Sequence, residues 1–139
     1  MKLILERINS KVAFKSTNEF GTAVQIDGSE SAGGEGLGLR PMELLATSLA
    51  SCLSIDILLI LKKMRIEPIK YEVHIQSKRK DAVPSSFESI HLTFVVDKND
   101  PREKIEKAIQ LSLDKYCSVA ASLSNEIKIS FDVITPIKL

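Results

Sequence analysis

The sequence predicts an α+β domain in which two helices pack on antiparallel strands. Strand-like and helix-like patterns follow one another in the order βββ-α-ββ-α-β, which is typical of helices packed on one antiparallel sheet. Of the 139 residues, 44% are hydrophobic and 27% charged, so the chain is long enough for one core and too apolar to be disordered. We expect a single domain over residues 1–139, with N-terminal strands and a glycine-rich loop in 1–40 and a helix-hairpin-helix-strand core in 41–139.

The composition excludes several classes of function. Nineteen Lys and Arg against 18 Asp and Glu give a net charge of +1, which favours neither a nucleic-acid nor an anionic-membrane surface. Glu6 and Arg7 interrupt any signal-peptide core, so we expect a cytoplasmic protein. His74 and His91 lack the spacing of metal ligands, and residues 78–80 (Lys-Arg-Lys) are a short solvated cluster at a hairpin tip.

Three short strands are predicted before residue 27. Residues 2–8 and 11–15 are separated by Asn9-Ser10, and residues 20–26 follow a turn at Thr17-Asn18-Glu19. These segments therefore predict a small antiparallel sheet.

A glycine-rich loop follows these strands. Residues 27–38 hold five of the six glycines, which predicts a mobile loop. The segment lacks the Gly-Lys-Ser/Thr ending of a phosphate-binding loop. It is either a linker or the rim of a pocket, and the sequence leaves both open.

Residues 41–63 predict a long helix. Pro41 at the first helical position and Glu43 in the first turn mark its start, whereas Lys63 suits its C-terminal end and Pro68 prevents its continuation. Apolar residues surround the helix axis instead of forming one stripe, so we expect the helix to be buried on nearly all sides.

The need to bury this apolar helix predicts an oligomer. Asp56 near its middle, together with the polar residues between Thr47 and Asp56, argues against a membrane span. One chain with one further helix has little material to wrap 23 residues of helix. A second copy would supply the cover, so we predict an obligate homodimer with an apolar interface and no membrane partner.

A hairpin and a last strand complete the predicted sheet. Residues 71–78 alternate apolar and polar side chains, and residues 87–97 follow a turn at 80–86, which predicts an antiparallel hairpin. A final strand is predicted at 127–134, and it ends before Pro136.

The second helix is predicted to start at an N-cap Asp100, with Pro101 as its first residue and Glu103 as the partner of a capping box. Cys117 lies where this helix should end or bend into 118–123. One face of the helix shows a spacing of 3.6 residues: Ile105, Ala108, Ile109, Ser112, Leu113 and Tyr116.

The two cysteines are the chemically reactive residues. Cys52 lies among small residues on the first helix, and Cys117 lies at the end of the second. Their thiols could meet and form a reversible disulfide in a reducing compartment. The alternative is that each is an inert, buried, small hydrophobic residue.

The sequence around both cysteines resembles the OsmC/Ohr family. Residues 41–56 (Pro-Met-Glu-Leu-Leu-Ala-Thr-Ser-Leu-Ala-Ser-Cys-Leu-Ser-Ile-Asp) look like the family signature, which runs from Pro-x-Glu-Leu to a reactive cysteine. Residues 115–119 (Lys-Tyr-Cys-Ser-Val) resemble its second cysteine motif, and Pro84-x-x-Phe87-x-x-Ile90-x-Leu92 resembles its middle hairpin. The likeness is closest to the YhfA-like branch.

The resemblance implies an OsmC-like fold, with an antiparallel sheet wrapped around central helices in an intertwined homodimer. It also implies thiol-dependent reduction of organic hydroperoxides at the subunit interface, in an apolar pocket built from the helix and the glycine-rich loop, with no metal, haem or flavin cofactor. Cys52 would attack the peroxide, Cys117 would resolve the sulfenic acid as a disulfide, and an external dithiol would reduce it. The alternative is a non-catalytic small-molecule-binding or redox-sensing protein on the same fold.

Family peroxidases also use an arginine near the thiol, because a thiol of pKa ~8.5 is mostly protonated at neutral pH. Arg7 and Arg40 precede Cys52, and both remain candidates. The family glutamate stands one position earlier than Glu43, where this chain has Met42. On a regular helix Glu43 would point away from Cys52, because nine residues at ~100° each make a half-turn. Asp56 would raise the thiol pKa if both faced one cavity.

Overall fold

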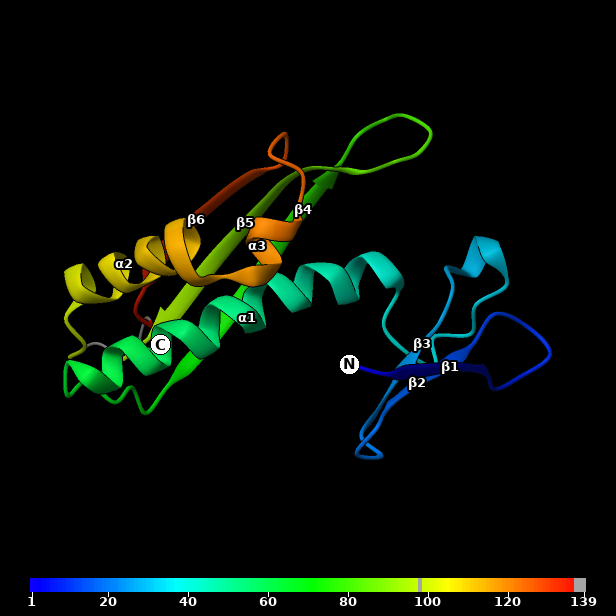
Figure 1. The fold of residues 1–139 in the computed structure, drawn as a ribbon. Helices are drawn as coiled ribbons and strands as arrows, with labels where there is room; N and C mark the ends of the chain where they lie inside the picture. The colour runs from blue at the N-terminus through cyan, green and yellow to red at the C-terminus, as the bar shows by residue number, and fades with distance from the viewer. Residues whose placement is uncertain (98, 137–139) are drawn as a thin grey trace. The chain divides into compact units, whose positions relative to one another are not determined.

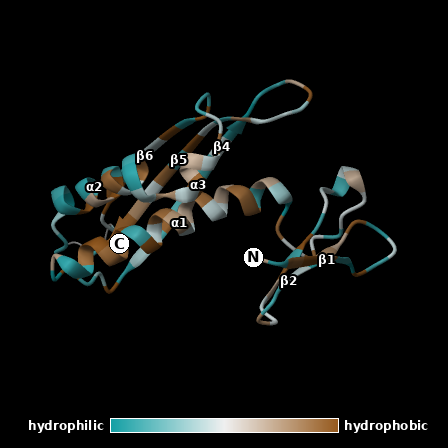
Figure 2. Cartoon of the chain, viewed as in Figure 1, coloured by the Kyte–Doolittle hydropathy of each residue, from teal (hydrophilic) through white to brown (hydrophobic). Residues whose placement is uncertain are grey.

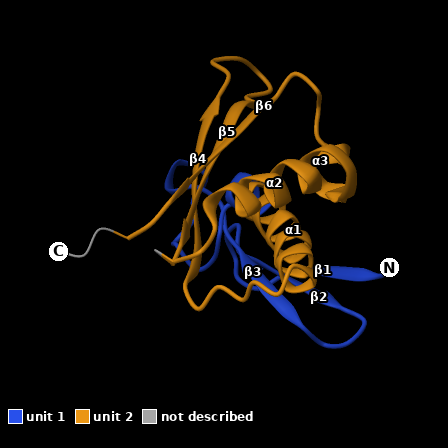
Figure 3. Ribbon diagram, turned by 90° about the vertical axis from the view of Figure 1, so that its left-hand side faces the viewer, with its two compact units in different colours: residues 1–45 blue, residues 46–139 orange. Residues whose placement is uncertain are grey.

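The computed structural model describes residues 1–97 and 99–136. Within them the chain forms two compact units, residues 1–45 and residues 46–139 (Figure 3). The boundary falls inside the first long helix, a few residues after the predicted division at residue 40. That the whole chain forms one domain stays a prediction.

Unit 1, residues 1–45, contains a three-stranded antiparallel sheet in the order β1-β2-β3 (Figure 1). The strands are β1 (Leu3–Arg7), β2 (Phe14–Asn18) and β3 (Ala23–Ile26). The second strand begins three residues later than predicted, because Asn9 folds the preceding segment into a turn. Its Oδ1 atom accepts the backbone N–H of Ala13 at 3.1 Å, and turns of this kind are typical of asparagine.

The glycine-rich loop is held in place by a buried carboxylate. Asp27 is only 1% exposed. One of its carboxylate oxygens accepts the backbone N–H groups of Glu35 at 2.9 Å and Leu37 at 3.0 Å. The loop includes a short 3-10 turn, η1 (Glu30–Ala32). The predicted mobile loop is therefore folded around Asp27.

The long helix α1 spans Pro41–Lys63, as predicted. Figure 2 shows hydrophobic residues along much of it. Its buried side is formed by Ala46, Leu49, Ala50, Leu53, Ile57 and Leu61.

Within one chain, however, the burial of α1 is one-sided. Ile55 and Leu59 are 62% and 57% exposed, so one chain leaves a side of the helix uncovered, and burial on nearly all sides stays a prediction for the homodimer. By length and composition alone α1 could also cross a membrane, a test that core helices of soluble proteins pass as well.

Unit 2 is built on a second three-stranded sheet, β4-β5-β6. Strands β4 (Tyr71–Arg79) and β5 (Phe87–Val96) form the predicted antiparallel hairpin. Strand β6 (Lys128–Ile134) pairs with β5 in the parallel direction, so the prediction of a wholly antiparallel sheet is wrong. The reason is the helical crossover between them, because a strand that returns after a crossover can run parallel to its predecessor.

Helices cover one face of this sheet. Figures 1 and 3 both show α1 and the second helical region on the same side of β4-β5-β6. Side chains of β5 alternate toward them, and Ile90, Leu92 and Phe94 are fully buried. This layered core confirms the predicted α+β class and positions the cysteine-bearing segments.

The second helical region has three parts: α2 (Arg102–Leu111), a π-helical segment η2 (Ser112–Tyr116) and α3 (Ser118–Ser122). Its N-cap is Pro101. The predicted N-cap Asp100 is wrong, because its carboxylate instead accepts the backbone N–H of Asp97.

The π-helical segment also changes which side chains are buried. Ile105, Ala108, Ile109 and Ser112 are fully buried as predicted, but Tyr116 is 50% exposed. A π turn contains more residues than an α turn. Side chains after Ser112 therefore no longer lie on the buried face that a spacing of 3.6 residues predicts.

Candidate functional site

Cys52 occupies the first half of α1, on a stretch of helix anchored in the core. Leu49 and Leu53, on either side of it, are fully buried. Cys52 itself is half-buried and is a free thiol. Its sulfur is therefore fixed by the packing of its neighbours while keeping partial access to solvent.

Cys117 occupies the junction between η2 and α3, where the sequence predicts an end or bend. It is buried, with 3% exposure. Its backbone N–H donates to the carbonyl of Ser112 at 2.8 Å, which closes the π turn. Its Sγ accepts the backbone N–H of Ala120 at 3.3 Å. Cys117 thus caps α3 with its sulfur atom.

The structure places the two thiols near each other, close enough for Cys52 to act on the pKa of Cys117. Burial is the main cause that raises the pKa of Cys117 to about 11, and the neighbouring Cys52 raises it further. The amide of Ala120 acts in the opposite direction. Cys117 consequently keeps its proton at neutral pH and can donate it toward the sulfur of Cys52.

Asp56 lies one helical turn beyond Cys52, and its carboxylate has a specific partner. Its Oδ2 atom accepts the hydroxyl of Ser112 at 2.9 Å. Ser112 is fully buried, so this bond satisfies a polar group that would otherwise be costly to bury. A cavity of about 140 Å³ adjoins the pair, and it is lined by Asp56, Leu59, Ile60, Lys63 and Tyr116.

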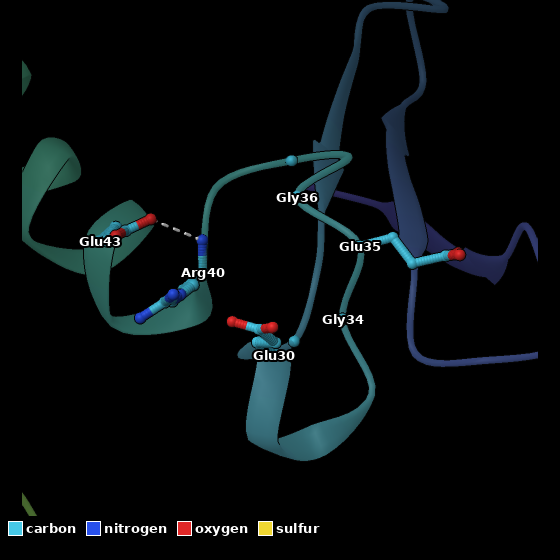
Figure 4. Close-up of a pocket in the computed structure, with 8 residues that line it drawn as sticks. Glu30, Gly34, Glu35, Gly36, Arg40 and Glu43 are labelled. Atoms are coloured by element: carbon cyan, nitrogen blue, oxygen red, sulfur yellow. Dashed lines mark hydrogen bonds between the residues drawn. The ribbon is translucent and has the colours of Figure 1, made fainter.

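The remaining predicted site residues, Arg7, Arg40 and Glu43, belong to unit 1. Arg7 is tied to its own turn, because its guanidinium donates to the backbone carbonyls of Ser10 and Lys11. Glu43 accepts the backbone N–H of Arg40 at 2.9 Å (Figure 4). This is the glutamate half of a capping box at the start of α1. Glu43 therefore has a structural role in capping the helix.

A polar hollow of about 490 Å³ lies at the glycine-rich loop within unit 1. Figure 4 shows the side chain of Glu30 pointing toward Arg40, whereas that of Glu35 points away from them. The residues that line the hollow are Gly28, Glu30, Gly34, Glu35, Gly36, Gly38, Arg40 and Glu43. The loop therefore borders a charged hollow here, and the apolar pocket expected at the subunit interface stays a prediction.

No group of three or more metal-ligating side chains occurs among residues 1–97 and 99–136. His91 instead lies 2.8 Å from the hydroxyl of Ser130 on the neighbouring strand. His74 contacts Glu72 at 3.3 Å on its own strand. Both histidines thus have strand neighbours as partners.

Two residues of this arrangement are not singled out by sequence patterns. Ser112 appears there only as a member of an apolar helix face, although a serine on such a face is itself a signal of a buried hydrogen bond. Asp27 is the first residue of the glycine-rich loop, where an aspartate commonly holds backbone amides.

An α+β core that brings together two free thiols from separate helical regions defines the class of protein, a dithiol protein. Residues 33–132 match the family described as OsmC-like protein. The chain is 35% identical over 97 residues to Protein YhfA of Escherichia coli (strain K12), covering 68% of this chain and 72% of that one. The chain belongs to the OsmC-like protein family, and the predicted likeness to the YhfA-like branch is confirmed.

Solved structures show the same fold. A hypothetical protein from Aquifex aeolicus VF5 is 33% identical, with a TM-score of 0.78 over 98% of this chain and 97% of that one. The organic hydroperoxide resistance protein OhrB of Bacillus subtilis is 19% identical, with a TM-score of 0.64 over 96% of this chain and 98% of that one. The fold is thus shared with proteins named for resistance to organic hydroperoxides.

Proposed function

We propose that this protein is a homodimeric, thiol-dependent reductase of organic hydroperoxides. The observation that carries the proposal is the proximity of Cys52 and Cys117, two free thiols that lie 65 positions apart in the chain. Structural relatives named as organic hydroperoxide resistance proteins support the choice of substrate class. The chemistry needs a reducing compartment, which fits the expected cytoplasmic location.

Cys52 is the thiol that attacks the peroxide. It is half-buried, whereas Cys117 is 3% exposed and holds its proton. The Cys52 thiolate attacks the distal oxygen of ROOH, the O–O bond breaks, and the leaving alkoxide takes up a proton to give the alcohol. The sulfur is oxidised to a sulfenic acid and the peroxide is reduced.

Cys117 is the resolving thiol. Its sulfur attacks the sulfenic sulfur of Cys52, an S–S bond forms, and the hydroxyl leaves with the proton of Cys117 as water. The Ala120 N–H that points at Cys117 Sγ stabilises negative charge as it develops on that sulfur. An external dithiol then reduces the disulfide by exchange.

The resemblance to the family implies an arginine that assists the Cys52 thiol. Arg40 is the better of the two candidates, because its guanidinium makes no ion pair within the described chain, whereas the guanidinium of Arg7 is engaged by turn carbonyls. Glu43 would act indirectly, through the backbone amide of Arg40 and the start of α1.

The homodimer is proposed from two exposed apolar surfaces. On α1, Ile55, Leu58 and Leu59 are between 40% and 62% exposed. On strand β1, at the edge of its sheet, Leu3–Leu5 are 60% exposed or more. A soluble chain rarely leaves such surfaces uncovered, and a second copy would bury them.

The test is consumption of cumene hydroperoxide with dithiothreitol as reductant. We expect turnover by the wild-type protein and none by Cys52→Ser. Cys117→Ser should form a sulfenic acid that dimedone traps but no intramolecular disulfide. Ser51→Ala, a change at the exposed neighbour of Cys52, should keep turnover.

Equal turnover by Cys52→Ser would overturn the proposal. A single oxidation per chain without turnover would also contradict it and would favour the redox-sensing alternative. No oxidation of either thiol would favour the small-molecule-binding alternative.

A further inference from the structure

The hydrogen bond between Asp56 and Ser112 joins the two helical regions that carry the thiols. Asp56 follows Cys52 by four residues, so the two side chains lie on the same side of α1. Ser112 opens the π-helical segment that ends just before Cys117. The contact therefore ties the helix of one thiol to the segment that presents the other.

Ser112 makes this link with two different groups. Its hydroxyl donates to Asp56 Oδ2 at 2.9 Å, and its backbone carbonyl accepts the N–H of Cys117 at 2.8 Å. The second bond spans five residues, the spacing of a π turn, where an α-helix would use the carbonyl of residue 113. One buried residue thus fixes both the carboxylate on α1 and the backbone of Cys117.

The resulting arrangement is a closed path. It runs from Cys52 along one turn of α1 to Asp56, through Ser112 to the backbone of Cys117, and back to Cys52 through the neighbouring thiols. Two helical regions that are already held together lose less conformational entropy when a disulfide forms between them. Only the Asp56–Ser112 bond in this path is made by side chains that take no part in the thiol chemistry.

We propose that Asp56 and Ser112 are positioning residues for disulfide formation, and that their hydrogen bond sets the effective concentration of one thiol at the other. The bond acts on the second step, in which the Cys52 sulfenic acid and the Cys117 thiol give the disulfide and water. It does not touch the peroxide. For the physiological reaction this inference rests on the proposed function.

The first test measures the Cys52–Cys117 disulfide in glutathione redox buffers, without any peroxide. In this equilibrium oxidised glutathione takes up two electrons from the two thiols and is reduced to two glutathione thiols. Ser112→Ala and Asp56→Ala should lower the effective concentration about tenfold, which corresponds to about 30 mV in the two-electron potential.

Asp56→Asn separates hydrogen bonding from charge. The asparagine carbonyl still accepts the Ser112 hydroxyl, so the effective concentration in this variant should stay within about threefold of the wild-type value. If Asp56 acted through its charge, the effective concentration would fall in Asp56→Asn as it does in Asp56→Ala. Ser54→Ala is the matched control, because Ser54 is also hydrogen-bonded on α1 but contacts Ala50 and Tyr71 and has no bond to η2. Its effective concentration should be unchanged.

The second test separates the two steps of the reaction with cumene hydroperoxide. Ser112→Ala should form the sulfenic acid at the wild-type rate but convert it to the disulfide about tenfold more slowly. Unchanged potentials in both Ser112→Ala and Asp56→Ala would overturn the inference, as would equal losses in Ser54→Ala. If the wild type fails to react with peroxide while the potentials still shift, the proposed function fails and the positioning role stands.

Discussion

Tyr71 on β4 donates its hydroxyl to Ser54 on α1 across 3.1 Å. The hydroxyl of Ser54 in turn donates to the backbone carbonyl of Ala50 at 2.7 Å. The pair joins the sheet of unit 2 to the helix that carries Cys52. Burial raises the pKa of Tyr71 to about 12, so its hydroxyl stays protonated far above neutral pH.

Tyr71→Phe should lower the free energy of unfolding by about 1 kcal/mol, the usual net value of such a hydrogen bond. Urea denaturation measures it. Because the pKa of folded Tyr71 lies above its ordinary value of 10, the wild type should lose stability as the pH rises from 10 to 12. Tyr71→Phe should lose less over this range, and an equal loss in both proteins would contradict the assignment.

Asp27→Asn should destabilise the glycine-rich loop. Hydrogen bonds from the backbone amides of Leu37 and Glu35 lower the pKa of the Asp27 carboxyl below its ordinary value of 3.8. The carboxylate therefore contributes its full stabilisation above pH 3.8, and this is lost as the pH falls through the lowered pKa of the folded state. Hydrogen exchange of the Glu35 and Leu37 amides at pH 6 and pH 3 measures the effect, and the pH dependence should shrink in Asp27→Asn.

Gly34→Ala should disrupt the same loop by a direct clash, because an added Cβ would lie 2.0 Å from the backbone oxygen of Gly28. Gly33→Ala is its control. Gly33 has φ +90° and open space around it, so alanine there costs only backbone strain of ~1–2 kcal/mol. We expect the larger loss of thermal stability in Gly34→Ala, and the reverse order would refute the loop packing.

Alkylation should distinguish the two thiols. At pH 8, iodoacetamide should modify Cys52 first, because Cys117 is buried and its pKa is about 11. Peptide mass mapping gives the site of modification. In Cys52→Ala the pKa of Cys117 should fall but stay above its ordinary value of 9.0, since burial is its main cause and the neighbouring thiol a smaller one.

Ile55→Glu should dissociate the proposed homodimer. Ile55 is 62% exposed in the single chain, so a charge there disturbs no packing within it but becomes buried and unpaired at an apolar interface. Light scattering after size exclusion should show a dimer for the wild type and a monomer for Ile55→Glu. Lys62→Glu, an exposed change near the end of the same helix, should remain dimeric, and a dimeric Ile55→Glu would move the interface elsewhere.

Local signals explain which elements the sequence predicts well. Pro41 and Lys63 mark the two ends of α1, and both bounds agree with the structure. The alternation of Tyr71, Val73 and Ile75 with polar residues likewise matches the half-buried face of β4. These features depend on residues close together in the chain, so the pattern alone determines them.

Features that depend on distant residues escape such patterns. The hydroxyl of Ser112, the first residue of the π-helical segment, is satisfied by Asp56, 56 positions away, and no local spacing predicts that partner. The sequence does single out Cys52 and Cys117 as residues that could meet. It does not reveal the carboxylate and hydroxyl that connect their helices, because that contact exists only once both helices are packed.

The parallel pairing of β5 with β6 bears on how the molecule folds. The β4–β5 hairpin is local and needs only its own turn, but β6 finds its register only after the chain has returned through α2, η2 and α3. Long-range parallel pairing is intrinsically slow. The last strand should therefore dock late, and until it does the β5 edge remains open to pairing with other chains. Newly synthesised chains in which β6 has not yet docked would therefore be prone to aggregate through the open edge of β5.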